Sequence, residues 1–110
     1  MLTNRLRKNS EFKLVYQNGH VYRSRYFILR CLERTDSADT RVGIAPSRKI
    51  RTAVERNKIK RRVRELYREY KHLVKDGMDL VFIIKFNALS VSFFTLKKDF
   101  EYLLKKSRLI

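Results

Sequence analysis

The sequence predicts an α+β fold: a two-layer α-β sandwich with the element order α-β-β-α-β-α. Three observations predict it: the chain has 110 residues, 44% of them are hydrophobic, and the apolar residues follow helix spacing in some segments and strand spacing in others. A chain of this length can bury a core without a disulfide or a structural metal ion. Residues 1–110 are therefore predicted to form a single domain.

The first part of the chain is predicted to contain one short helix and one long strand. Residues 10–18 have apolar positions at helix spacing, with Asn9 or Ser10 as the N-terminal cap and Gly19 after the last turn. Residues 21–32 place successive side chains on opposite faces of an extended segment, as in a strand. Both elements are expected to precede a polar turn.

The remainder is predicted to alternate between strands and long helices. We expect a polar turn at residues 33–40, a strand at 41–45, a long helix at 53–74, a doubly buried strand at 79–85 and a final amphipathic helix at 92–106. The continuous apolar run in the last strand indicates a central position in the sheet. Elements in this order are typical of helices packed against a sheet.

The long predicted helix has a defined start and two different faces. Thr52 and Glu55 are spaced as a capping box, in which the two residues satisfy each other's backbone N–H groups. The apolar stripe, expected to pack on the sheet, consists of Ile59, Val63, Leu66, Tyr67, Tyr70, Leu73 and Val74. The opposite stripe is mostly basic and consists of Asn57, Arg61, Arg64, Arg68 and Lys71, with Lys60 at its edge.

The charge of the chain indicates a polyanionic partner. Lysine and arginine total 27 against 11 acidic residues, which gives a formal charge of +16, and self-repulsion of this size destabilises an isolated domain. The basic residues concentrate at the start of the long helix, where cations oppose the helix dipole and backbone N–H groups favour phosphate. Because arginine binds phosphate oxygens in a bidentate manner, a nucleic-acid surface is predicted here in preference to a solvated basic face.

A membrane surface is the competing interpretation of a basic amphipathic helix, but the apolar stripe of this helix is needed for the core. The N-terminus lacks the apolar segment of a signal peptide, and no run approaches the roughly 18 apolar residues of a membrane span. Cys31 is the only cysteine and cannot form an intramolecular disulfide. We therefore expect a cytoplasmic protein with no membrane contact and no disulfide.

No catalytic residue and no metal site are predicted in the polypeptide itself. His20 and His72 lie far apart, without a spacing motif. The aspartates near predicted turns are Asp36, Asp39, Asp76 and Asp79. Solvation in a turn explains these aspartates better than a two-metal site, because they lack a hydrophobic frame.

Two stretches of the sequence resemble the bacterial ribonuclease P protein subunit. They read Val42-Gly-Ile-Ala-Pro-Ser-Arg-Lys49 and Ala53-Val-Glu-Arg-Asn-Lys-Ile-Lys-Arg-Arg-Val-Arg-Glu65, and residues 5–19 fit as well. The family's Arg-Asn-Arg signature reads Arg56-Asn57-Lys58 in this chain. Lys58, at the third position, keeps the positive charge but lacks the bidentate geometry of arginine. The resemblance covers essentially the whole chain.

The resemblance implies the protein subunit of a ribonucleoprotein endonuclease, a hydrolase that removes the 5′ leader from precursor tRNA. It implies that a large RNA subunit is the catalyst and uses Mg²⁺, while the protein binds the leader and stabilises the catalytic RNA. It also implies a left-handed β-α-β crossover around the long helix, although about 98% of such crossovers are right-handed.

The resemblance and the residue types indicate two sets of RNA contacts. Contacts to the catalytic RNA are expected from Arg48, Lys49, Arg56, Asn57, Lys58, Lys60, Arg61, Arg64 and Arg68. Contacts to the single-stranded leader are expected from Phe12, Lys13, Tyr16, Tyr26 and Arg30. Aromatic rings beside cations suit a single strand, because a stacked base contributes about 1–3 kcal/mol. A non-enzymatic RNA-binding protein such as a ribosomal protein, and a DNA-binding module, remain as alternatives.

Overall fold

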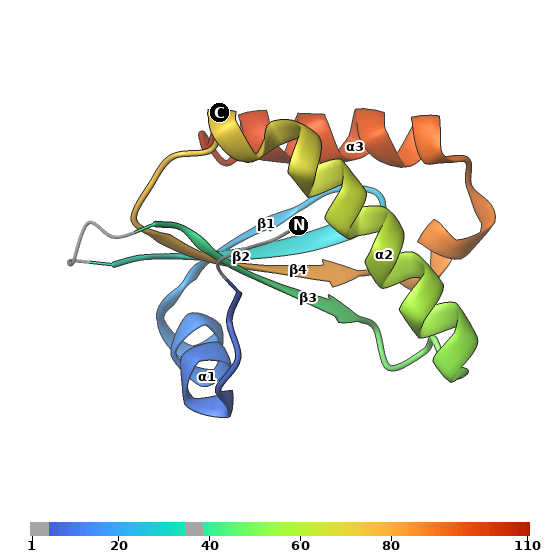
Figure 1. Ribbon diagram of the computed structural model, residues 1–110, viewed down its shortest axis with the longest axis horizontal. Helices are drawn as coiled ribbons and strands as arrows, with labels where there is room; N and C mark the ends of the chain where they lie inside the picture. Colours follow the sequence, from blue (N-terminus) through green and yellow to red (C-terminus); the bar gives the residue numbers. More distant parts are fainter. Residues whose placement is uncertain (1–4, 35–38) are drawn as a thin grey trace.

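The protein is built on a four-stranded sheet with helices on both faces (Figure 1). The computed structural model describes residues 5–34 and 39–110. Its elements are α1 (Asn9–Asn18), β1 (His20–Arg23), β2 (Phe27–Glu33), β3 (Arg41–Pro46), α2 (Ala53–Tyr70), η1 (Lys71–Leu73), β4 (Met78–Ile84), η2 (Phe86–Ser90) and α3 (Phe93–Lys106), where η denotes a 3₁₀ helix. The predicted α+β class and the order of helices and strands are confirmed, with the first predicted strand divided in two.

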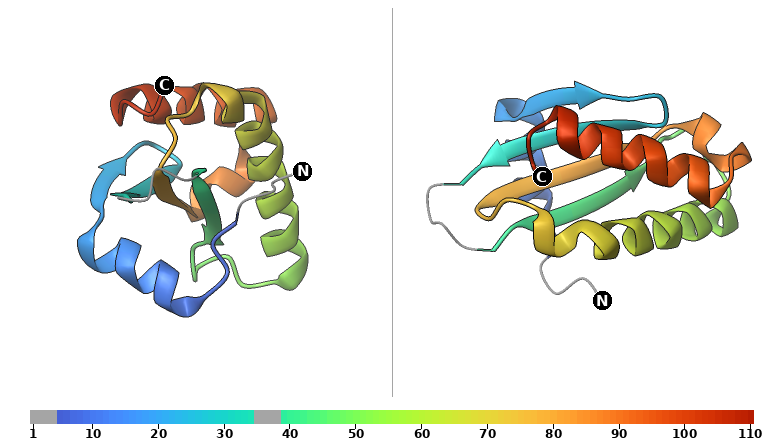
Figure 2. Two further views of the ribbon diagram at one scale, coloured as in Figure 1. Left: turned by 60° about the vertical axis from the view of Figure 1, so that its left-hand side comes forward. Right: turned by 90° about the horizontal axis from the view of Figure 1, so that it is seen from above.

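The strands lie in the order β1-β2-β4-β3. β2 is antiparallel to both of its neighbours, whereas β3 runs parallel to β4. α2 connects β3 to β4, so these three elements form a β-α-β crossover. The right-hand view of Figure 2, with the helices toward the viewer, shows that the crossover is left-handed. The family resemblance implied this hand, which is contrary to the usual rule.

The two faces of the sheet are covered unequally. α2 and α3 lie side by side over one face, and α1 lies alone on the other (Figures 1 and 2). Alternating residues of β4 point to the two sides: Leu80 and Phe82 belong to the main core under α2 and α3, while Val81 packs with Leu6 and Val15 on the side of α1. The doubly buried character predicted for β4 is therefore confirmed.

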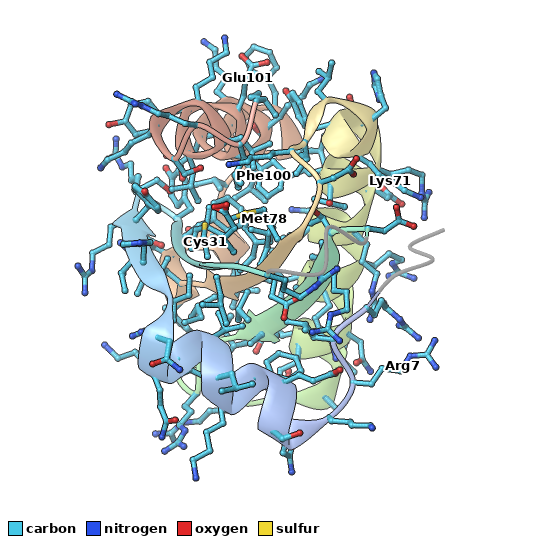
Figure 3. All side chains as sticks on the ribbon, turned by 90° about the vertical axis from the view of Figure 1, so that its left-hand side faces the viewer. Arg7, Cys31, Lys71, Met78, Phe100 and Glu101 are labelled. Atoms are coloured by element: carbon cyan, nitrogen blue, oxygen red, sulfur yellow. The ribbon has the colours of Figure 1, made fainter. Side chains whose placement is uncertain are left out.

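Aromatic rings fill the main core. The ring centroids of Phe82 and Phe100 are 4.9 Å apart, and Phe27 meets Phe100 nearly edge-on at 5.5 Å. Figure 3 shows Phe100 pointing from α3 toward the sheet. These contacts join α3 to the central strands β2 and β4.

The end of the long helix differs from the prediction. The helix was expected to continue to residue 74, but α2 ends at Tyr70 and the chain tightens into η1. Val74 is still buried, whereas Leu73 is 56% exposed and does not belong to the core. The change in helix geometry after Tyr70 turns Leu73 away from the face that the α-helical spacing predicts.

The single strand predicted at residues 21–32 is in fact a hairpin, formed by β1 and β2. The carboxylate of Asp99, on α3, holds the turn by accepting hydrogen bonds from Ser24 Oγ at 2.7 Å and from the backbone N–H groups of Arg25 and Tyr26 at 3.2 and 2.9 Å. The turn contains no glycine, proline or asparagine, and Ser24 is its one residue of a typical turn type, so the local signal is weak. Its stabilising group comes from a distant helix.

The start of α1 also differs from the prediction. Lys8 occupies the N-cap position, in place of Asn9 or Ser10. The carboxylate of Glu11 satisfies the first backbone donors, because its Oε1 accepts the N–H groups of Arg7 at 2.9 Å and of Lys8 at 3.0 Å. The capping group therefore lies inside the first turn, where an acidic side chain also favours the helix dipole.

Asp79 lies in β4 and is buried, so its interpretation as a solvated turn residue was wrong. Its side chain binds Arg34 Nη1 at 2.6 Å and Arg41 through Nε at 2.8 Å and Nη2 at 2.6 Å. Arg41 Nη1 also binds Glu11 at 2.6 Å. These ion pairs connect α1, β3 and β4. Asp36 and the middle of the turn predicted at residues 33–40 lie outside the described residues.

Candidate nucleic-acid interface

α2 presents the basic face that the sequence predicts. Its start is fixed by Thr52, whose Oγ1 accepts the N–H of Glu55 at 3.2 Å and donates to the Glu55 carboxylate at 3.0 Å. The buried residues of the helix are Ile59, Val63, Leu66, Tyr67 and Tyr70. Because the core occupies this side of α2, the opposite side faces solvent.

The outward side chains of α2 are mostly cations. Asn57, Lys58, Arg61 and Arg68 are exposed, as is Lys71 at the start of η1, and Lys60 and Arg64 are half-buried. Within the described residues, none of these cations forms an ion pair with a carboxylate. Arg48 and Lys49 are exposed in the loop before α2. Guanidinium groups carried by a rigid helix are well placed to bind phosphate in a bidentate manner.

Arg56 differs from the other cations of α2, because its guanidinium is engaged by the protein itself. It donates to the carbonyl oxygens of Ile50 at 2.8 Å, Ser47 at 3.0 Å and Pro46 at 3.3 Å. These bonds hold the loop between β3 and α2 against the helix. Arg56 therefore positions the loop, and its predicted contact with RNA stays a prediction.

A pocket of about 510 Å³ lies where the N-terminal segment, β3 and α2 meet. Its lining residues are Arg5, Leu6, Arg7, Phe12, Val42, Gly43, Ile44, Lys60 and Arg64. The lining combines four cations with apolar side chains, a combination that suits a base and its phosphate. Arg5 and Arg7 were not predicted as site residues, although the basic run at residues 5–8 could have indicated them. Figure 3 shows Arg7 and Lys71 projecting from the same side of the molecule.

Phe12 connects the two predicted RNA surfaces. Its ring lies directly on Gly43, where an added Cβ would be 2.5 Å from Phe12 Cε1. The half-buried ring also lines the pocket that Lys60 and Arg64 line. The sequence separated a leader surface from a helix surface, but the structure brings residues of both sets to one pocket.

Tyr16 and Arg30 are a second predicted pair that the structure brings together. The guanidinium carbon of Arg30 lies 5.1 Å from the centroid of the Tyr16 ring, and its Nη1 donates to the Tyr16 carbonyl at 3.3 Å. Tyr16 is 39% exposed, and Lys13 beside it is exposed. Tyr26 does not join this group. It is buried in the main core under α2 and α3, which separates it from the other residues predicted to contact the leader.

An open part of the sheet continues from Arg30 on the side of α1. Ile28 of β2 pairs with Ile83 of β4, and both side chains are half-buried. They line a hollow of about 380 Å³ together with Lys49 and Phe86. Lys49, which was predicted to contact the catalytic RNA, therefore borders the surface predicted for the leader.

The protein environment shifts the pKa of a group on each side of the sheet, Glu11 on α1 and Cys31 in the main core. The backbone N–H groups of Lys8 and Arg7, assisted by the charge of Arg41, lower the pKa of the Glu11 carboxyl. Burial raises the pKa of the Cys31 thiol to about 12. The thiolate is the reactive form of cysteine, so Cys31 is not a nucleophile at neutral pH.

Within residues 5–34 and 39–110, no group of three or more His, Cys, Asp or Glu side chains could hold a metal ion. No helix in this part of the chain is both long and apolar enough to cross a membrane.

The chain matches a known protein family over nearly its whole length. The sequence model of the family Ribonuclease P matches residues 2–108. The ribonuclease P protein component of Bacillus pumilus is 36% identical over 104 residues, covering 94% of this chain and 87% of the relative. The protein of the same name from Bacillus velezensis is 37% identical over 106 residues, with 96% and 90% covered.

Solved structures agree with this match. The RNase P protein of Staphylococcus aureus superposes with a TM-score of 0.88 at 29% identity, with 97% of each chain covered. The RNase P protein of Thermotoga maritima gives a TM-score of 0.82 at 32% identity, with 94% of this chain and 96% of that chain covered. These similarities favour the ribonuclease P interpretation over a ribosomal protein or a DNA-binding module.

Proposed function

This chain belongs to the bacterial ribonuclease P protein family, and we propose that it contacts two RNAs through two adjoining surfaces. The outward face of α2 binds the RNA subunit, and the face of the sheet beside α1 binds the 5′ leader of precursor tRNA. The observation that carries the proposal is the pocket at the junction, which Arg7, Phe12 and Lys60 line together. In this proposal the RNA subunit supplies the catalysis.

The proposed contact with the RNA subunit depends on the geometry of α2. The outward side of α2 carries three arginines at helix spacing, Arg61, Arg64 and Arg68, which together extend over about 10 Å of the helix axis. Each guanidinium offers a fork of donors that matches two oxygens of one phosphate. Because the apolar side of α2 is fixed in the core, these cations keep their relative positions before RNA binds.

The proposed leader path runs along the side of the sheet that carries α1. It begins at Tyr16, whose exposed ring offers a surface for a base, beside the cation of Arg30. It continues over Ile28 and Ile83 toward Lys49, which lines the same hollow. Stacking surfaces that alternate with cations suit a single strand of any sequence.

We also propose that Mg²⁺ acts on the RNA side of the complex. Within residues 5–34 and 39–110, no three His, Cys, Asp or Glu side chains lie together as a metal site would need, and three of the carboxylates already serve the fold: Asp79 binds two arginines, Asp99 holds the β1–β2 turn, and Glu11 caps α1. No catalytic step is therefore assigned to the polypeptide. A cytoplasmic location is part of the same proposal, since the one cysteine, Cys31, is free and buried.

The test of the function is cleavage of a precursor tRNA by the cognate RNA subunit at low Mg²⁺ concentration. We expect the protein to accelerate formation of the mature 5′ end. The same rate with and without the protein would contradict the proposed function.

The leader surface has a separate test with Tyr16→Ala in the assembled complex. Loss of one stacked base corresponds to about 1–3 kcal/mol, so KM should rise about fivefold or more for a substrate with a long leader. A substrate without a leader should be unaffected. Leu14→Ala is the matched control, because Leu14 is on the same helix and 52% exposed. Equal losses with both substrates would show that Tyr16 does not act through the leader.

A further inference from the structure

The outer face of α3 carries a regular stripe of aromatic and basic side chains that the two proposed surfaces do not include. The stripe consists of Phe94, Lys98, Tyr102 and Lys106, each four residues after the last, and all four are exposed. Phe94 is 64% and Tyr102 is 55% exposed, which is unusual for large rings on a helix whose other side is fully buried. The core does not account for these two rings.

Each ring of the α3 stripe is paired with the lysine that follows it. Lys98 Nζ lies 5.0 Å from the centroid of the Phe94 ring, and Lys106 Nζ lies 5.7 Å from that of Tyr102. The pairs produce an alternation of ring and cation along one side of the helix. This is the pattern that suits a single nucleic-acid strand, in which bases stack and phosphates meet charge.

The acidic residues of α3 do not neutralise the stripe, because other groups engage them. Asp99 accepts hydrogen bonds from the β1–β2 turn. The Glu101 carboxylate accepts the hydroxyl of Tyr70 at 3.0 Å and pairs with Lys105 at 3.6 Å. The outer face of α3 is therefore apolar at its rings and positive between them.

Charge and spacing decide between the partners that could cover this face. A second copy of the chain would bring another formal charge of +16 against the first. A membrane favours a continuous apolar face, whereas lysines separate the two rings here. Phe94 and Tyr102 are eight residues apart, or about 12 Å along the helix axis, so each ring must take a base of its own.

We propose that the α3 stripe binds an unpaired segment of the RNA subunit by stacking one base on Phe94 and another on Tyr102. This inference rests on the proposed function for its choice of RNA. α3 lies beside α2, the proposed binding helix for the RNA subunit, and on the opposite side of the sheet from α1 (Figure 1). A segment of the RNA subunit reaches α3 from α2 without crossing the sheet, whereas the leader would have to pass around its edge.

The first experiment places the photo-crosslinking residue p-benzoylphenylalanine at position 102 of the full chain, assembled with the RNA subunit and precursor tRNA. We expect a cross-link from this position to the RNA subunit. The same residue at position 14, on the exposed side of α1, is the matched control and should give no such product. A cross-link only to precursor tRNA, only to a second protein chain, or to no partner would overturn the proposal.

The second experiment compares two double variants in binding to the RNA subunit over a range of salt concentrations. Phe94→Ala with Tyr102→Ala should reduce affinity about tenfold or more, because base stacking is removed, and should leave the salt dependence unchanged because every phosphate keeps its cation. An unchanged affinity would overturn the stacking proposal, as would a lower affinity accompanied by a changed salt dependence.

The comparison variant, Arg61→Ala with Arg64→Ala, tests α2 independently. It should reduce both the affinity and the salt dependence, since it removes cations that bind phosphate. If it changes neither while the α3 variant weakens binding, the proposal for α2 fails and the stacking on α3 stands. The two failures are therefore distinguishable.

Discussion

Arginines are concentrated in two regions, the outward face of α2 and the ion-pair cluster between α1 and the sheet, but their charges have different partners. In the ion-pair cluster, Arg34 and Arg41 surround the buried carboxylate of Asp79, and Arg41 also binds Glu11. On α2, Arg61 faces solvent and, within the described residues, has no carboxylate partner. The difference teaches that a count of cations cannot locate an RNA surface, because some of them neutralise the protein's own acids.

Arg56 shows that a single helix can contain both kinds of arginine. It is one residue from Asn57, which faces outward, but its guanidinium binds three carbonyl groups of the preceding loop. In this chain, the Arg56-Asn57-Lys58 motif therefore combines a residue that stabilises the loop with two residues that are exposed to solvent. Substitutions should separate these roles by their effects on stability and on RNA affinity.

The largest effect is expected at Asp79. Asp79→Asn leaves Arg34 and Arg41 without the carboxylate that both bind, and disruption of a buried ion pair costs about 3–5 kcal/mol. The free energy of unfolding, measured in urea, should fall by about 3 kcal/mol or more. Asp76→Asn is the control, because Asp76 is exposed. A loss at Asp79 no larger than that of the control would show that the ion pairs contribute no net stability.

The next largest effect is expected at Arg56. Arg56→Ala removes charged hydrogen bonds to three carbonyl oxygens, so stability should fall by about 2 kcal/mol. Arg56→Lys should restore only part of the loss, because an ammonium lacks the planar fork of donors. Thermal unfolding of both variants measures this. If Arg56→Ala reduced RNA affinity and left stability unchanged, Arg56 would belong with the RNA-facing cations.

A third prediction concerns Arg61 and Arg64, for which the effect on stability should be small. The double change to alanine should alter the free energy of unfolding by less than about 0.5 kcal/mol per site, since neither residue belongs to the core. The slope of log affinity against log salt should decrease by roughly 0.7–0.9 for each phosphate that the variant no longer neutralises. Binding of the RNA subunit at several salt concentrations, together with urea unfolding, tests both statements.

The smallest effect is expected from Glu11 and should depend on pH. The pKa of its carboxyl is lowered in the folded protein from a usual value of 4.5, so the folded state favours the charged form. Its stabilising contribution is therefore complete above the unfolded pKa and is lost as the pH falls through the lower folded value. Melting temperatures of the wild type and Glu11→Gln should differ at neutral pH and converge in acid. Glu65→Gln, at an exposed glutamate of α2, is the control substitution.

The sequence predicted α2 well, because its determinants are local. Thr52 and Glu55 mark the start of the helix, and five of the predicted apolar positions are its buried residues. The exposed cations follow from the same periodicity. Local spacing could not predict the end of the helix, since η1 changes the number of residues per turn and moves Leu73 into solvent.

The parts that sequence reasoning missed depend on residues distant in the chain. Asp99 stabilises the β1–β2 turn across a separation of 75 residues from Ser24. Asp79 is tolerated in a buried strand because Arg34 and Arg41 reach it from 45 and 38 residues away. The pocket that Arg7, Phe12 and Lys60 line has the same origin, because it unites the N-terminal segment, which pairs with Val42 of β3, with residues of α2.

The edge of the sheet at β3 is closed to a further strand almost along its whole length. The carbonyl of Val42 accepts the N–H of Leu6, so the backbone groups of Val42 point away from β4. Because the backbone groups of successive strand residues point in alternate directions, those of Ile44 and Pro46 point outward as well. Pro46 has no N–H group, and its carbonyl accepts Arg56. Only Ile44 offers a complete pair of backbone groups at the edge. Strand-to-strand association through β3 therefore has a single point of attachment, and restricting an edge in this way is one means by which proteins avoid aggregation through their sheets.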